Sequence, residues 1–129
     1  MPALQAPHSS LLTPTMTIRG VWITNTDSKV LHSRRNIAEA MDFLAATGFN
    51  VVFPDVWNKG FTLYPSQMMR SHFGVEIAPQ YAGRDPLAEI VTEAQRVGIK
   101  VIPWFEYGFA NVFFVTSTLH SYLFRTTDN

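Results

Sequence analysis

The sequence contains no cysteine and no excess of either charge. Without cysteine the chain can form neither a disulfide framework nor a thiolate metal site. Ten lysines and arginines balance ten aspartates and glutamates, so the formal net charge is zero. A balanced charge gives no indication of a nucleic acid or an anionic membrane as a partner.

No apolar run is long enough to cross a bilayer, so the sequence predicts no membrane partner. Residues 1–16 carry no lysine or arginine ahead of an apolar segment and are interrupted by three prolines. We therefore expect a disordered lead-in there rather than a signal peptide. As written, the sequence predicts a soluble, cytoplasmic protein, and export stays open because an altered start can hide a signal.

Several catalytic motifs are also missing. There is no glycine-rich phosphate loop and no serine in a nucleophile elbow, which disfavours nucleotide chemistry and serine hydrolysis. The four histidines, His8, His32, His72 and His120, share no metal-ligand spacing. The sequence therefore predicts neither a metal site nor another cofactor.

Strand-like and helix-like patterns alternate along the middle of the chain. Runs rich in β-branched and aromatic residues predict strands at 19–25, 49–56 and 101–109. The segments between them carry apolar residues at helical spacing, and a glycine, Gly48 or Gly98, follows each helix. The order β-α-β-α-β predicts an α/β fold with a parallel sheet.

The starts of both helices are marked by capping residues. Ser33 or Asn36 can cap the first helix, because a short polar side chain there accepts a hydrogen bond from the first turn. Asp85 and Pro86 supply a cap and a first-turn proline for the second helix.

The connections that leave the strands are much longer than those that enter them. They run from Thr26 to His32 and from Asn58 to Arg84. Long loops are often functional, and in parallel α/β folds ligands bind at the carboxyl ends of the strands. We therefore expect any site to lie at that end of the sheet.

Three segments together resemble a known family. They are RGVWITNTDSKVL at 19–31, FPDVWNKGFTLYPS at 53–66 and GRDPLAEIVTEAQRVGIKVIPWFEYGF at 83–109. They resemble the glycosyl-hydrolase-like family 10 domain, a bacterial, glycosidase-like group with a (β/α)8 barrel. The resemblance covers residues 17–109 and implies a hydrolase of O-glycosidic bonds in a polysaccharide.

The resemblance also implies an incomplete domain. A (β/α)8 TIM barrel needs about 250 residues, and three strands of eight cannot close one. Residues 17–109 would be the amino-terminal part of the barrel, followed by an atypical tail at 110–129. In the family the catalytic carboxylates are expected on later strands, so we predict that the chain alone is inactive. The alternative is a non-catalytic sugar-binding α/β fragment, or one that self-associates through its open sheet edge.

Glu106 and Asp55 are the candidate catalytic residues, because glycoside hydrolysis commonly needs two carboxyl groups across the scissile bond. Each can instead be a structural carboxylate that holds the rim of the sheet together. For Glu106 a sugar-binding role is favoured over that of the acid. For Asp55 the neighbouring Pro54 also suggests a role in shaping the end of the strand.

Five further residues are candidates for substrate binding. Trp57 can stack on a sugar ring while Asn58 hydrogen-bonds its hydroxyls. Alternatively, Trp57 is a core residue at the mouth of the barrel. Asn25 and Trp104 are candidates on the same grounds, and Tyr64, in the long connection, is predicted to form a wall of the cleft.

Overall fold

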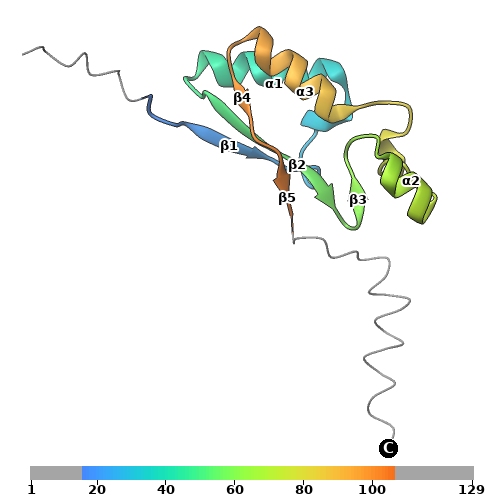
Figure 1. The fold of residues 1–129 in the computed structure, drawn as a ribbon. Coiled ribbons are helices and arrows are strands. Elements are labelled where there is room, and N and C mark those ends of the chain that lie inside the picture. The colour runs from blue at the N-terminus through green and yellow to red at the C-terminus, as the bar shows by residue number, and fades with distance from the viewer. Residues whose placement is uncertain (1–15, 107–129) are drawn as a thin grey trace, which may run out of the picture.

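The computed structural model describes residues 16–106, in which two helices pack on one face of a small sheet (Figure 1). Its strands are β1 (Gly20–Ile23), β2 (Val51–Asn58), β3 (Phe61–Thr62), β4 (Lys100–Val101) and β5 (Trp104–Phe105). Its helices are α1 (Arg34–Ala46), α2 (Gln67–Phe73) and α3 (Pro86–Arg96), with short 3-10 helices η1 (Val30–His32) and η2 (Pro79–Tyr81). The predicted lead-in, apart from Met16, and the predicted tail at 110–129 lie outside the described residues.

Strand β2 is the centre of the sheet. Val51 pairs in parallel with Gly20 of β1 on one side and with Lys100 of β4 on the other. Strand β5 continues beside β2 in the same direction, with Asp55 opposite Trp104. This topology confirms the predicted parallel α/β class, and its strand order is consistent with consecutive βα units of a TIM barrel.

The helices begin and end where the sequence predicted. Ser33 caps α1, its Oγ accepting a hydrogen bond from the N–H of Asn36 at 3.1 Å, so Asn36 is not the cap. Asp85 caps α3 in the same way, at 2.9 Å. Gly48 and Gly98 have φ of +89° and +78°, a left-handed conformation that glycine adopts without strain as the chain leaves each helix.

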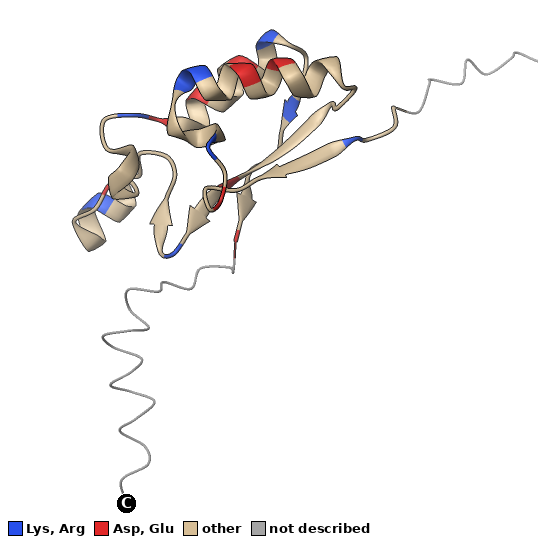
Figure 2. Ribbon diagram, turned by 180° about the vertical axis from the view of Figure 1, so that it is seen from behind, with Lys and Arg blue, Asp and Glu red and all other residues tan. Residues whose placement is uncertain are grey.

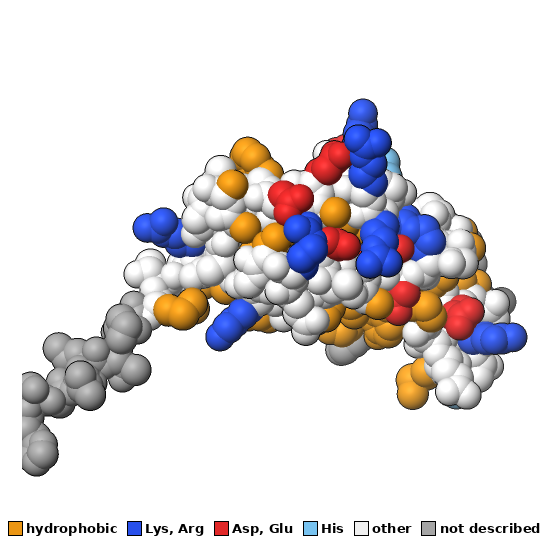
Figure 3. Space-filling model, turned by 90° about the horizontal axis from the view of Figure 1, so that it is seen from above, with side chains coloured by type: hydrophobic (Ala, Val, Ile, Leu, Met, Phe, Trp, Pro, Cys, Tyr) orange, Lys and Arg blue, Asp and Glu red, His pale blue; other side chains and the backbone are white. Residues whose placement is uncertain are grey.

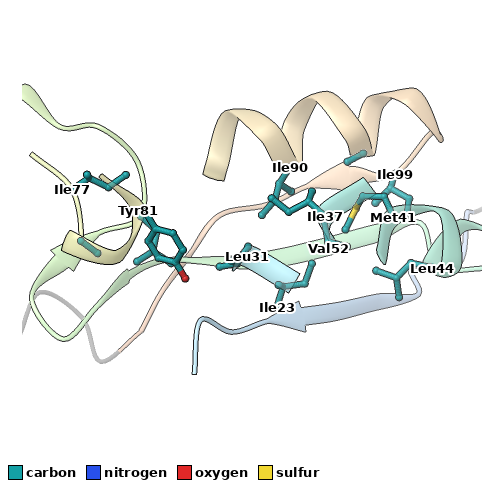
Figure 4. Packing of buried hydrophobic residues seen from close by; sticks show 13 residues of the cluster. Ile23, Leu31, Ile37, Met41, Leu44, Val52, Ile77, Tyr81, Ile90 and Ile99 are labelled. Carbon is teal, nitrogen blue, oxygen red and sulfur yellow. The ribbon is translucent and has the colours of Figure 1, made fainter. Parts of the chain in front are cut away.

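The hydrophobic core lies between the helices and the sheet, as Figure 4 shows. Its buried members are Ile23, Leu31, Ile37, Met41, Leu44, Val52, Leu63, Ile77, Ala78, Tyr81, Ile90, Ala94 and Ile99. The buried members on the helices, Ile37, Met41, Leu44, Ile90 and Ala94, all stand at the helical spacing from which the two helices were predicted. Burial of this apolar surface is the main source of stability for the layered arrangement.

Charged side chains lie mainly on the helices, whereas the strands carry few of them (Figure 2). Figure 3 looks down on the helical side and shows acidic and basic groups close together there. Arg34 and Arg96 of this surface form ion pairs with Glu93 and Asp42, which link α1 to α3. The helical layer is therefore apolar inside and charged outside.

The third predicted strand differs from expectation. The sequence predicted one buried strand over 101–109, but the strand is interrupted at Ile102 and Pro103 and leaves only β4 and β5. Proline has no N–H to donate to a sheet. Ile102 and Trp104 are also 48% and 45% exposed, because among the described residues β4 and β5 pair only with β2. Residues 107–109 lie outside the described part of the chain.

The long connection from Asn58 to Arg84 has more structure than the sequence predicted. Strands β2 and β3 form a hairpin through Lys59 and Gly60, whose φ angles are +54° and +82°. Two left-handed residues in succession are typical of the tightest hairpin turn. The connection then forms α2 and η2 and contributes Leu63 to the core.

Candidate carboxylate site at the strand ends

The sheet face opposite the helices carries two rows of side chains. On each parallel strand an aromatic residue is followed two positions later by a polar one, and side chains two apart on a strand share a face. The register sets Trp22 opposite Phe53, whereas Trp104 of β5 lies opposite Asp55, so the β5 segment is displaced toward the carboxyl ends of the strands. We call Trp22, Phe53 and Trp104 the aromatic row, and Thr24, Asp55 and Glu106, nearer the carboxyl ends, the polar row.

The aromatic row is ordered by ring contacts. Trp22 stacks on Phe53 with centroids 4.6 Å apart and planes 19° apart, and it meets Trp104 edge to face at 6.1 Å. Gly20 leaves room for this stack, because a Cβ at Gly20 would lie 2.5 Å from Cε2 of Phe53. Trp22 is nevertheless 59% exposed, so the row presents aromatic surface to solvent.

A pocket of about 240 Å³ lies between the two rows. It is lined by Trp22, Ile23, Thr24, Asp55, Trp104 and Glu106. Typical small-molecule sites measure about 300–1,000 Å³ and combine apolar walls with a few polar groups. This pocket has that composition and is smaller, as one part of a larger cleft would be.

Beside this pocket, the amide of Asn58 gathers three acceptors from three strand ends. Its Nδ2 donates to Asn25 Oδ1 at 2.9 Å, to Asp55 Oδ2 at 2.9 Å and to Glu106 Oε2 at 2.5 Å. Asn58 and Asp55 are buried, with 5% and 3% of their surfaces exposed. We call these four residues the Asn58 cluster. All four are predicted site residues that the structure brings together.

Backbone contacts fix the geometry of this cluster. Asp55 Oδ1 accepts a hydrogen bond from the N–H of Trp57 at 3.2 Å, and the N–H of Glu106 donates to the Trp57 carbonyl at 3.1 Å. The pairing of β2 with β5 shifts register between Asp55 and Trp57. Such irregularities redirect side chains at the ends of strands. Here the shift accompanies the approach of Glu106 to Asn58.

Burial raises the pKa of Asp55 from 3.8 to about 6. The N–H groups of Asn58 and Trp57 lower this pKa, while the hydrogen bond and the negative charge of Glu106 raise it. A carboxyl group that titrates near neutral pH can both give and take a proton under physiological conditions. Strongly shifted carboxyl groups beside a pocket are typical of functional sites.

The remaining predicted site residues are placed differently. Trp104 lines the pocket, but Trp57 is buried, as in the alternative that made it a core residue. Tyr64 follows β3, is half-buried and is not among the residues that line the pocket. Trp22 and Thr24 also line the pocket but were not predicted, although their spacing in and just after β1 matches that of Phe53 and Asp55 on β2.

Within residues 16–106, no group of three or more histidine, cysteine, aspartate or glutamate side chains is arranged to hold a metal ion. No helix in the same range has both the length and the apolar character needed to span a membrane.

Comparison with known proteins connects this site to a family. Residues 17–123 match the family model described as glycosyl hydrolase-like 10, a match that runs past residue 109, where the resemblance was expected to end. The chain is also 26% identical over 121 residues to proteins named glycosyl hydrolase DigH from Escherichia coli strain K12 and from Shigella flexneri. These similarities cover 81% of this chain but 28% of each relative, so the chain spans little more than a quarter of their length. Because the family model covers most of its residues, the chain belongs to the glycosyl hydrolase-like 10 family.

Proposed function

We propose that this chain supplies one part of a glycoside hydrolase domain that acts on O-glycosidic bonds of a polysaccharide. Membership of the glycosyl hydrolase-like 10 family supports the reaction class. The observation that carries the proposal is the Asn58 cluster, with two carboxyl groups beside a pocket that has exposed aromatic walls. Carboxyl groups and aromatic rings are the two components that glycosidases use for catalysis and binding.

Asp55 and Glu106 would act on the same side of the substrate. Glycosidase carboxyl groups that flank a scissile bond are about 5–9 Å apart. Asp55 and Glu106 instead accept hydrogen bonds from one amide nitrogen, which holds the two bonded oxygens at or below the short end of that range. We therefore propose that they form one proton-holding unit and that the opposing carboxyl group belongs to another strand. The chain by itself is then expected to lack hydrolytic activity.

Binding would use the pocket and its rim. Trp104, with Trp22 beside it, is proposed to stack on a sugar ring, and Asn25 is proposed to bond a sugar hydroxyl. Buried Trp57 is better suited to supporting the site from within. Tyr64 stays a candidate for a more distant wall, outside the pocket itself.

Binding is testable with a panel of soluble oligosaccharides titrated into the 15N-labelled chain. We expect the indole N–H signals of Trp22 and Trp104 to shift, and Trp104→Ala to weaken binding at least tenfold. Phe43→Ala is the matched control, because it removes an exposed aromatic ring outside the site. Absence of any shift at millimolar sugar would contradict the binding role, and robust turnover of an aryl glycoside would contradict the predicted inactivity.

Self-association is the second candidate function. Among the described residues, β1 on one side and β4 and β5 on the other pair only with β2, so both edges are open. Large apolar side chains are exposed along them, including Trp22, Ile102 and Phe105. Analytical ultracentrifugation distinguishes the two functions, because a compact monomer at high micromolar concentration would contradict association.

A further inference from the structure

We propose that Asn58 is a positioning residue that holds Asp55 and Glu106 as a pair sharing one proton, rather than a residue that contacts the sugar. This inference rests on the proposed function and refines it. It concerns how the site is organised before any ligand binds.

The amide nitrogen of Asn58 is fully used within the protein. Its Nδ2 carries two hydrogens, yet it faces three acceptors, on Asn25, Asp55 and Glu106. The residue is also buried and does not line the pocket. A sugar oxygen could accept a hydrogen bond from this nitrogen only by displacing one of the three existing acceptors. The geometry therefore suits an internal support better than a ligand contact.

One additional proton balances the hydrogen bonds of the cluster. With both carboxyl groups ionised, three acceptors would compete for two N–H groups, and two negative charges would be adjacent. A single O–H shared between Asp55 and Glu106 supplies the third donor and removes one charge. Carboxyl groups held this close commonly titrate as a pair, with one proton retained well above the ordinary range.

Within residues 16–106, neither Asp55 nor Glu106 forms an ion pair with lysine or arginine. The other titratable group that interacts with Asp55 is Tyr81 of η2, a buried phenol whose pKa is raised, chiefly by burial. The positive charge of Arg84 lowers the pKa of Tyr81. The Arg84 guanidinium itself donates hydrogen bonds to Glu89 and to the carbonyls of Leu31 and His32. A shared proton is therefore the available means of lowering the negative charge.

The test is a pH titration of the carboxyl carbons by 13C NMR on the full chain without ligand. In the unmodified chain we expect the carboxyl carbon of Asp55 to titrate in two steps. Glu106→Gln should give Asp55 a single step shifted down by about one pH unit, because a like charge is lost. Asn58→Ala should shift Asp55 up by a similar amount, because a donor to the carboxylate is lost.

Asn50→Ala is the matched control, since Asn50 also makes two amide hydrogen bonds, to Arg19 and Thr17, at the opposite end of the sheet. It should leave the titration of Asp55 unchanged. A single-step titration of Asp55 in the unmodified chain, or an unchanged Asp55 in Glu106→Gln, would overturn the shared proton, even if Asn58→Ala fails to fold. An Asn58→Ala chain that titrates normally but no longer binds oligosaccharide would overturn the positioning role. Two-step titration in a chain that binds no sugar would contradict only the proposed function.

Discussion

The two faces of the sheet are covered to very different extents. On one face α1 and α3 enclose side chains such as Ile37 and Ile90, which solvent hardly reaches. On the other face Trp22 and Trp104 are about half exposed, although ring contacts order them. The covered face gains stability from burial, whereas the exposed face keeps its aromatic and carboxyl groups accessible to other molecules or strands. The residues that stabilise the fold and those of the candidate site thus lie on opposite faces of the same sheet.

Truncation of the covered face should give the largest effect on stability. Ile90→Ala removes a buried side chain from the core and should lower the free energy of unfolding by about 2–5 kcal/mol. Trp104→Ala removes a larger group that solvent already reaches, and its cost should be about 1 kcal/mol or less. Urea denaturation of both variants is the measurement. Equal losses would show that the exposed rings also belong to the core.

Asp55, on the exposed face, should make the stability of the fold depend on pH, whereas the apolar side chains of the covered face should not. The pKa of Asp55 is raised from 3.8 to about 6 in the folded chain, first of all by burial. The folded state therefore holds this proton more tightly than the unfolded state, so ionisation of Asp55 destabilises the fold. Stability should fall as pH rises from about 4 to 6, by up to about 3 kcal/mol.

Thermal unfolding between pH 4 and 7 measures this slope. Asp55→Asn should flatten the curve and raise the melting temperature at pH 7, because the buried charge is gone. Asp27→Asn is the control, since Asp27 is an exposed carboxylate on the loop after β1. If the slope survives in Asp55→Asn, another group must be its source.

The stack of Trp22 on Phe53 can be disturbed by a substitution at Gly20. In Gly20→Ala the new Cβ would meet the ring of Phe53 at 2.5 Å, so the ring must move away from Trp22. We expect a loss of about 1–3 kcal/mol and a changed near-ultraviolet circular dichroism signal. Combining Gly20→Ala with Phe53→Ala should cost less than the sum of the two single changes. If the two losses of stability were strictly additive, the clash between the new Cβ and the ring of Phe53 would not be the cause of the loss in Gly20→Ala.

The covered face was largely predictable from the sequence, because its signals are local. Ser33 and Asp85 cap helices through hydrogen bonds within one turn, and Gly48 ends α1 through its own backbone conformation. The helical spacing of residues such as Ile37 and Ile90 identified the faces that became buried. Each of these features depends on residues within about two helical turns of one another, so it can be recognised in the sequence without knowledge of tertiary contacts.

The polar residues that meet at Asn58 were predicted as site residues, but their arrangement was not. Alternating βα units indicated that Asp55, Asn58 and Glu106 would share one end of the sheet. Their convergence on a single amide depends on the register shift between β2 and β5 and on the hairpin that follows Asn58. Both are properties of strand pairing. The exposure of Trp104 likewise depends on which strands pair beside it, and an apolar sequence alone suggested burial.

The outer surface of the helices should give the smallest effects, although ion pairs are concentrated there. Arg35 and Glu39 form an exposed pair at 2.8 Å within α1. Arg35→Ala should leave the free energy of unfolding nearly unchanged, because exposed ion pairs contribute little. Arg96→Ala breaks pairs with both Asp42 and Glu93, and it should cost somewhat more than Arg35→Ala because these contacts form a network.

The salt dependence of the Arg96→Ala variant tests whether its loss of stability comes from ion pairs. Exposed ion pairs are screened as ionic strength rises, whereas burial of apolar surface is not, so the cost of Arg96→Ala should shrink in 1 M sodium chloride while that of Ile90→Ala persists. Urea denaturation at low and high salt separates the two contributions. If Arg96→Ala were as costly as Ile90→Ala at both salt concentrations, the helices would be held by charge as much as by the core. The contrast between the two faces of the sheet would then no longer follow from burial alone.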